Sequence, residues 1–197
     1  MNDLLNRLGV PSDIQAFFNT QADLSFPFGD DAEHFGANFH RIPTTGNLWL
    51  AGNQNASEVI VTYSAMEAIA FMTANRQRYP NPGKLAFIAI GNKLQDKQIS
   101  WISRNFARAK FTMVFGNDLL GQITCIKLGA GLKKIPLRIQ HHNGKVSIHC
   151  KDKFRTFDEN RITYNAFQLA FAFRWKIRTR RPAKSLTYLE QLINDTH

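Results

Sequence analysis

The pattern of apolar and polar positions changes its period within one stretch, residues 57–75. The first part, Val59 to Tyr63, is a short β-branched run, which predicts a buried strand. In the second part apolar residues return every three or four positions, which predicts a helix from about residue 65; they are Met66, Ile69, Ala70 and Phe71. A strand that feeds directly into a helix is half of a βαβ unit.

Ser64 and Glu67 stand where that helix begins. They match the Ser-x-x-Glu pattern of a capping box. We therefore expect the Ser64 side chain to cap the first turn and the Glu67 side chain to return to the backbone of Ser64.

The same alternation continues along the chain. Strands are expected at 84–91 and 110–116, helices at 94–107 and 118–132, and a fourth strand at 135–139. Strands this apolar are usually covered on both faces, so we expect an α/β fold with a Rossmann-like, mostly parallel sheet flanked by helices. In such sheets function is expected at the carboxyl ends of the strands, which here carry Tyr63, Ser64, Gly91, Asn92 and Gly116 to Asp118.

The residues before this core predict a small appendage. Helical patterns cover residues 3–8 and 13–19, with Ser12 as the N-cap of the second helix, and residues 26–39 indicate loop and short strand. Metal-ligating residue types occur there without a fixed ligand spacing, so we interpret them as a solvated turn rather than a metal cluster. They are Asp30, Asp31, Glu33, His34 and His40.

The residues after the core predict a hairpin and helices. Asn143-Gly144 is a strong two-residue turn signal within residues 137–154. A long helix capped by Asp158 is expected at about 160–177, apolar nearly all round, and a short helix at 185–194. The expected parts are an N-terminal helical and β appendage (1–56), the α/β core (57–140), and a basic hairpin with C-terminal helices packed on the core (141–197).

Charge is distributed unevenly along the chain. The formal net charge is +10, yet residues 1–50 hold two Lys or Arg against six Asp or Glu. Residues 133–184 hold fourteen against three, a net charge of +11. Concentrated positive charge attracts polyanions, most commonly nucleic acid. The candidate phosphate contacts are Lys133, Lys134, Arg138, Lys151, Lys153, Arg155, Arg174, Lys176, Arg178, Arg180 and Arg181.

The remaining composition narrows the class of protein. No apolar run approaches the 18 or so residues of a membrane span, and no basic-then-apolar signal segment opens the chain. Cys125 and Cys150 lie far apart without metal-type spacing. We expect a cytoplasmic protein with free thiols and no membrane partner.

The strand ends of the core carry a family resemblance. The order Tyr63-Ser64-Ala65-Met66-Glu67, then Gly91, then Gly116-Asn117-Asp118-Leu119-Leu120-Gly121 resembles the Toprim domain of DNA primases and topoisomerases, in the variety found in conjugative and mobilisable elements. The resemblance implies a Toprim fold over about residues 59–140. In that family a Glu after the first strand acts in acid/base chemistry, and an Asp-x-Asp pair after the third strand holds Mg²⁺.

Two family positions are changed here. Tyr63 stands in place of the Glu, and Gly116 stands in place of the first Asp, so the motif is degenerate. Glu67 remains as a candidate catalytic residue and Asp118 as a candidate metal ligand. Since Mg²⁺ needs several oxygen ligands, and two-metal chemistry needs several carboxylates, we expect no cofactor, with Mg²⁺ bound only if the site is active.

These observations give one expected function and two alternatives. The expected function is non-catalytic nucleic-acid binding, to DNA and largely through phosphates, in replication or mobile-element transfer, with other replication or transfer proteins as further partners. The first alternative is a metal-dependent nuclease or primase-type nucleotidyltransferase that uses Glu67 and Asp118, with another acid such as Glu58 or Asp96. The second is a protein–protein scaffold.

Overall fold

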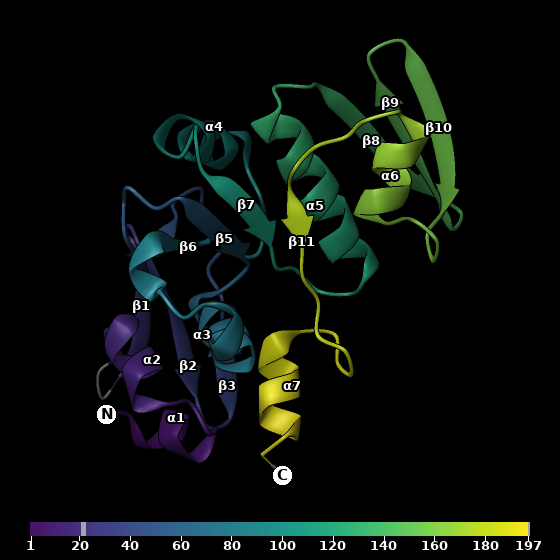
Figure 1. The fold of residues 1–197 in the computed structure, drawn as a ribbon. Helices are drawn as coiled ribbons and strands as arrows, with labels where there is room; N and C mark the ends of the chain where they lie inside the picture. The colour runs from purple at the N-terminus through teal and green to yellow at the C-terminus, as the bar shows by residue number, and fades with distance from the viewer. Residues whose placement is uncertain (21–22, 197) are drawn as a thin grey trace.

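A five-stranded mixed sheet runs through the middle of the fold (Figure 1). The structure is a computed structural model that describes residues 1–20 and 23–196. The strand order is β11-β7-β5-β6-β4, and only β4 runs antiparallel to its neighbour. The strands are β4 (Trp49–Gly52), β5 (Glu58–Thr62), β6 (Leu85–Ala89), β7 (Lys110–Met113) and β11 (Arg178–Thr179).

Three of these strands lead into the helices that cover the sheet. β5 precedes α3 (Ala65–Asn75), β6 precedes α4 (Asp96–Asn105), and β7 precedes α5 (Leu119–Leu132). Short 3-10 turns, η1 (Arg76–Arg78) and η2 (Pro82–Lys84), join α3 to β6. Helices α4 and α5 lie on one face and α3 on the other (Figure 1). The predicted alternation of strand and helix is therefore confirmed from residue 58 to residue 132.

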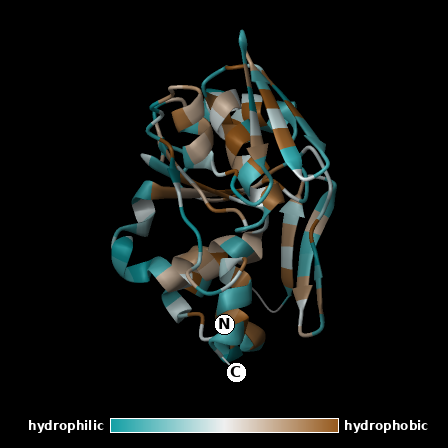
Figure 2. Ribbon diagram, turned by 90° about the vertical axis from the view of Figure 1, so that its right-hand side faces the viewer, coloured by the Kyte–Doolittle hydropathy of each residue, from teal (hydrophilic) through white to brown (hydrophobic). Residues whose placement is uncertain are grey.

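Burial explains why the strands are uninterrupted apolar runs. Ile60 packs into the core on the α3 side, whereas Val59 and Val61 pack into the core on the α4 and α5 side. All three side chains are fully buried. A strand covered on both faces has no solvent side on which polar residues would alternate. Figure 2 shows the hydrophobic segments gathered in the central sheet and the helices against it.

The N-terminal residues form more regular structure than the sequence predicted. Helices α1 (Asp3–Arg7) and α2 (Ser12–Phe17) confirm the two helical patterns, but Pro11, not Ser12, is the N-cap of α2. The residues expected to be loop and short strand instead form a three-stranded antiparallel sheet. Its strands are β1 (Leu24–Phe28), β2 (Asp31–Gly36) and β3 (Phe39–Arg41).

A second antiparallel sheet follows α5. Its strands are β8 (Leu137–His142), β9 (Lys145–Cys150) and β10 (Lys153–Asp158). The predicted turn is confirmed, with φ of +48° at Asn143 and +71° at Gly144. The expected fourth strand of the main sheet at 135–139 is wrong. Residues 137–139 belong to β8, which pairs with β9 in the register that this turn sets, Leu137 opposite Cys150.

The long helix predicted at 160–177 is also wrong. Helix α6 (Tyr164–Ala170) is capped by the Thr163 side chain rather than by Asp158. The chain leaves the helix at Phe171, and Ala172 has φ of +58°. Beyond it the rings of Phe173 and Trp175 stack with centroids 4.5 Å apart, and the segment continues into β11.

The last helix, α7 (Tyr188–Asn194), packs beside α3 near the end of the chain (Figure 1). Both Tyr188 and Leu189 are buried in the core on the α3 side. Among the residues that the structure describes, no helix has the length and apolarity that crossing a membrane requires.

Candidate functional site

The carboxyl end of β5 places Tyr63 against α5. Its hydroxyl shares a hydrogen bond of 2.8 Å with the hydroxyl of Thr124, and its ring packs on Phe115. Burial, the largest effect, raises the pKa of the Tyr63 phenol, and the nearby charge of Asp118 raises it further. The phenol therefore stays protonated at neutral pH and supplies no charged ligand or base there.

Glycines allow close backbone contacts after the other two strands, β6 and β7. Gly91 has φ of +76°, and a Cβ atom there would lie 2.5 Å from the carbonyl oxygen of Pro43. A Cβ atom on Gly121 would lie 2.0 Å from the carbonyl oxygen of Gly116. Larger residues are excluded from both positions by the backbone itself, so these glycines have a structural reason independent of any activity.

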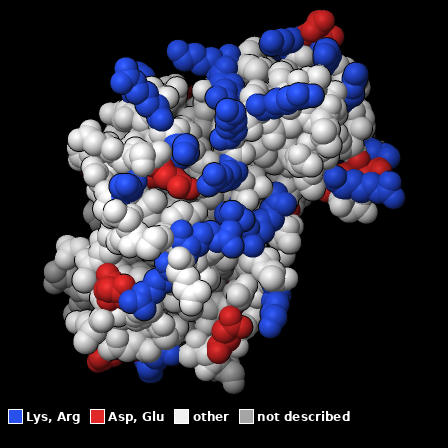
Figure 3. Space-filling model, viewed as in Figure 1, with Lys and Arg blue, Asp and Glu red and all other residues white. Residues whose placement is uncertain are grey.

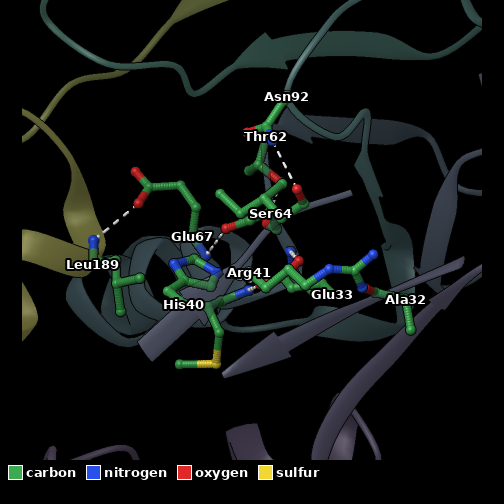
Figure 4. Close-up of polar contacts among 12 residues, drawn as sticks. Ala32, Glu33, His40, Arg41, Thr62, Ser64, Glu67, Asn92 and Leu189 are labelled. Carbon is green, nitrogen blue, oxygen red and sulfur yellow. Dashed lines mark hydrogen bonds and ion pairs between the residues drawn. The ribbon is translucent and has the colours of Figure 1, made fainter. Parts of the chain in front are cut away.

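The start of α3 is capped by two side chains. The Ser64 hydroxyl accepts a hydrogen bond from the backbone N–H of Glu67, which confirms the predicted N-cap. The carboxylate of Glu33, from β2, accepts from the N–H groups of Ala65 (2.6 Å) and Met66 (3.0 Å) (Figure 4). The first three N–H groups of α3 are thus all paired.

Glu33 corrects the prediction of a solvated turn. Its side chain is fully buried on β2, and its Oε1 lies 3.0 Å from Nε2 of His40 on β3. A buried carboxylate needs such partners, because desolvation without them is costly. The negative charge also lies at the positive end of the α3 dipole.

Glu67 does not close the predicted capping box. Its carboxylate points away from Ser64 and accepts from the N–H groups of Tyr188 (2.8 Å) and Leu189 (2.9 Å) at the start of α7. The Thr187 hydroxyl accepts from the next N–H, that of Glu190, so α7 repeats the capping arrangement of α3. Burial, the largest effect, raises the pKa of the Glu67 carboxyl, while these backbone hydrogen bonds lower it.

Asp118 likewise has a structural partner. It is exposed at the N-cap of α5, where its Oδ1 accepts from the N–H of Gly121 at 2.8 Å. Glu58, one of the further acids considered, is the first residue of β5, at the opposite end of that strand from Tyr63. Across the residues the structure describes, no three His, Cys, Asp or Glu side chains are grouped as metal ligands.

The C-terminal segment passes beside the start of α5. The N–H of Asn117 donates to the carbonyl oxygen of Leu186 at 3.0 Å. Arg181 donates a hydrogen bond from Nη2 to Oε1 of Gln122 at 2.5 Å. Burial raises the pKa of the nearby Cys125 thiol, and the charge of Arg181 lowers that pKa by a smaller amount. Arg181, a predicted phosphate contact, is therefore half-buried and already paired with a side chain of the fold.

Several cations lie along the β11 edge of the main sheet, and Figure 3 shows basic side chains gathered across this face. We define this basic band as Arg78, Lys110, Lys133, Lys134, Lys176, Arg178 and Arg180. The four lysines line one cavity. Arg178 lies opposite Thr112 in the register between β11 and β7.

The far part of the basic band lies around two tyrosines. Burial raises the pKa of the Tyr79 phenol, and the nearby Arg180 and Arg178 lower it. Arg180 and Arg78 have the same lowering effect at Tyr188, where burial is again the larger effect. The basic band contains five predicted phosphate contacts, together with Arg78 and Lys110. These two were not predicted, because they lie outside the +11 segment of the chain.

The other predicted phosphate contacts lie apart from the basic band. Arg138, on β8, and His149 and Phe154 share one row across the outer face of the second antiparallel sheet. Lys151 forms the turn between β9 and β10, while Lys153 and Arg155 are exposed on β10, and Arg174 is exposed between α6 and β11.

The chain matches none of the known family models, no curated protein and no solved structure.

Proposed function

We propose that this chain is a Toprim-like, non-catalytic nucleic-acid-binding protein that serves DNA replication or mobile-element transfer. The single observation that carries the proposal is the basic band. Its cations come from η1, from β7, from the end of α5 and from the segment around β11, so separate parts of the chain contribute to one surface.

The charge balance of the basic band favours phosphate as the ligand. Glu58 is its close acidic neighbour, 3.8 Å from Arg178, and its Oε1 also accepts a hydrogen bond from Thr112. The Nε of Arg180 is buried and lacks a hydrogen-bond partner within the described residues. A lysine at the end of a helix is stabilised by the helix dipole and by water, which explains a single cation. It does not explain a cluster, because clustered cations repel one another unless an anion binds.

The roles of the acidic residues support binding rather than catalysis. Glu67 uses both carboxylate oxygens to cap α7, and Asp118 caps α5. Tyr63 and Gly116 supply no carboxylate. Mg²⁺ would be needed only for the alternative of a nuclease or primase-type nucleotidyltransferase, in which Asp118 would be a ligand.

The test is fluorescence anisotropy of labelled single- and double-stranded DNA and RNA across a salt series. Phosphate contacts release counterions, so log K should fall steeply with log salt, with little dependence on base sequence. The variant Lys176→Ala/Arg178→Ala should lower the magnitude of this slope by about two, since each contact contributes roughly 0.9 on double-stranded DNA. The matched control, Arg7→Ala/Lys93→Ala, removes two exposed cations outside the basic band.

The same samples separate the alternatives. Binding that is absent at low salt, or unaffected by salt, would overturn the proposal. Strands cut or extended with Mg²⁺ or Mn²⁺, in a reaction lost in Asp118→Ala, would show an active nuclease or primase-type enzyme. Co-purification of a protein after nuclease treatment, without nucleic-acid binding, would favour the scaffold.

A further inference from the structure

One end of the basic band is a cavity rather than a flat surface. It has a volume of about 360 Å³ and lies between the end of α4, the start of β7 and the end of α5. Lys110, Lys133, Lys134 and Lys176 line it, together with the hydroxyl-bearing Ser103. None of the described residues that line it carries a carboxylate.

Helix geometry explains only two of these lysines. Lys133 is the C-cap of α5 and Lys134 follows it, where cations interact favourably with the negative end of the helix dipole. Lys110 comes from β7 and Lys176 from the segment before β11. Four like charges around one cavity repel each other unless an anion compensates them.

Lys134 also adopts an unfavourable backbone conformation. Its φ is +54°, in the left-handed region. Its N–H donates to Gly131 and the next N–H, that of Ile135, donates to Ala130, which is the Schellman arrangement at the end of a helix. Glycine is the usual residue at this position because a Cβ atom destabilises it. A lysine placed there loses local stability, and the cavity gives a reason for its presence.

We propose that this cavity binds a terminal phosphate monoester of a nucleic-acid strand, whose remaining phosphates follow the basic band. The inference rests on the proposed nucleic-acid binding and adds recognition of a strand end. A monoester carries about −1.5 to −2 charges at pH 7, because its second pKa is near 6. A phosphodiester carries only one negative charge. Four cations without a carboxylate among them therefore favour the more highly charged terminal phosphate. Lysine binds phosphate as a point charge, in keeping with a cavity that has no guanidinium fork.

The experiment compares strands of one sequence, labelled internally, that carry a 5′-phosphate, a 3′-phosphate or no terminal phosphate. The full chain should bind one of the phosphorylated strands about tenfold more tightly than the strand without a terminal phosphate, a difference equal to one or two ion contacts. Whichever end is preferred identifies the source of the phosphate. Inorganic phosphate, added as a competitor, should reduce this preference.

Two glycine variants separate binding from folding. Lys134→Gly should raise the thermal midpoint yet reduce the preference to about twofold or less, by removing both the backbone strain and one ion contact. Lys151→Gly is the matched control, since Lys151 has the same φ of +54° but lies outside the cavity. It should raise the midpoint and keep the preference. Lys176→Ala, at an exposed position, should reduce the preference without the backbone change.

The outcomes distinguish failure of this site from failure of nucleic-acid binding as a whole. Equal affinity for all three strands overturns recognition of the strand end and leaves nucleic-acid binding intact. A preference that survives in both Lys134→Gly and Lys176→Ala places the strand end elsewhere and overturns this site. Failure of every strand to bind at low salt overturns both proposals together.

Discussion

Replacement of Glu67 by alanine should detach α7 from the rest of the molecule. In the structure this carboxylate, on the first turn of α3, accepts the N–H groups of Tyr188 and Leu189. All three residues are buried. In Glu67→Ala the two N–H groups lose their acceptor at a position that water does not reach freely. The substitution therefore tests whether one side chain couples two helices that are more than a hundred residues apart along the chain.

The expected loss of unfolding free energy is about 2 kcal/mol. An unpaired buried donor costs about 1–3 kcal/mol, and two donors are affected. The loss is partly offset, because the variant no longer buries a carboxylate whose pKa is raised by desolvation. Glu67→Gln keeps the shape and one acceptor oxygen, so it should lose about 1 kcal/mol or less.

Urea unfolding measures the global loss, and amide hydrogen exchange locates it. Protection should fall mainly in α7, while β5 and β6 keep their protection until global unfolding. A stability of Glu67→Ala within about 0.5 kcal/mol of the unaltered chain, which is typical of a surface substitution, would refute the reasoning. So would unchanged exchange of the Tyr188 and Leu189 amides.

The pH dependence of the same pair has a defined sign. The pKa of the Glu67 carboxyl is raised in the folded state above its ordinary value of 4.5. The folded state then takes up a proton before the unfolded state as pH falls. The stability of the unaltered chain relative to Glu67→Gln should rise as pH falls from above the pKa of the folded state toward 4.5. Below pH 4.5 the difference in stability should stay constant. A relative stability that decreases over that range would contradict the assignment.

Three further substitutions and modifications test other parts of the structure. Glu33→Ala should lose about 2–4 kcal/mol by chemical denaturation, because it leaves two N–H groups of α3 and the ring of His40 without their buried acceptor; a loss below 1 kcal/mol would contradict this. Lys134→Gly should gain roughly 0.5–1 kcal/mol in the same assay, and a loss would show that its backbone is unstrained. Burial raises the pKa of Cys125 to about 12, so iodoacetamide should modify this thiol slowly in the folded protein and rapidly in urea; equal rates would contradict its burial.

The periodicity of the sequence was sufficient to predict the strand-and-helix alternation of the core. Strands such as β5 are covered on both faces, and their continuous apolar runs reflect that burial directly. The N-cap Ser64 was also predictable, because its hydroxyl acts within the first turn of its own helix.

The segment 160–177 shows how an apolar run can mislead. Phe171, Phe173, Trp175 and Ile177 alternate with polar or small residues, which is a period of two and indicates an extended chain. The many apolar residues before them favoured a continuous helix instead. In the structure this alternation begins where α6 ends and leads into β11, with the stacked rings of Phe173 and Trp175 between them.

The capping carboxylates and the basic band depend on tertiary structure. Glu67 fits a local capping box by spacing, yet its side chain caps α7. Glu33, on β2 of the N-terminal antiparallel sheet, caps α3. No pattern in a single sequence links residues 33 and 65, or 67 and 188. Arg78 and Lys110 join the basic band for the same reason, since folding brings them to the C-terminal cations.

The two-residue strand β11 has a consequence for how the chain is synthesised. β11 pairs with β7, and the backbone N–H of Arg180 donates to the carbonyl oxygen of Met113. Residues near 180 therefore cover the edge of a sheet whose other four strands are complete by residue 113. During translation that edge is complete only after more than sixty further residues have been made. Until then β7 presents unpaired backbone groups, which are sites for aggregation. Nascent or truncated chains that end before Arg178 should therefore associate more readily than the full chain, and depend more on chaperones.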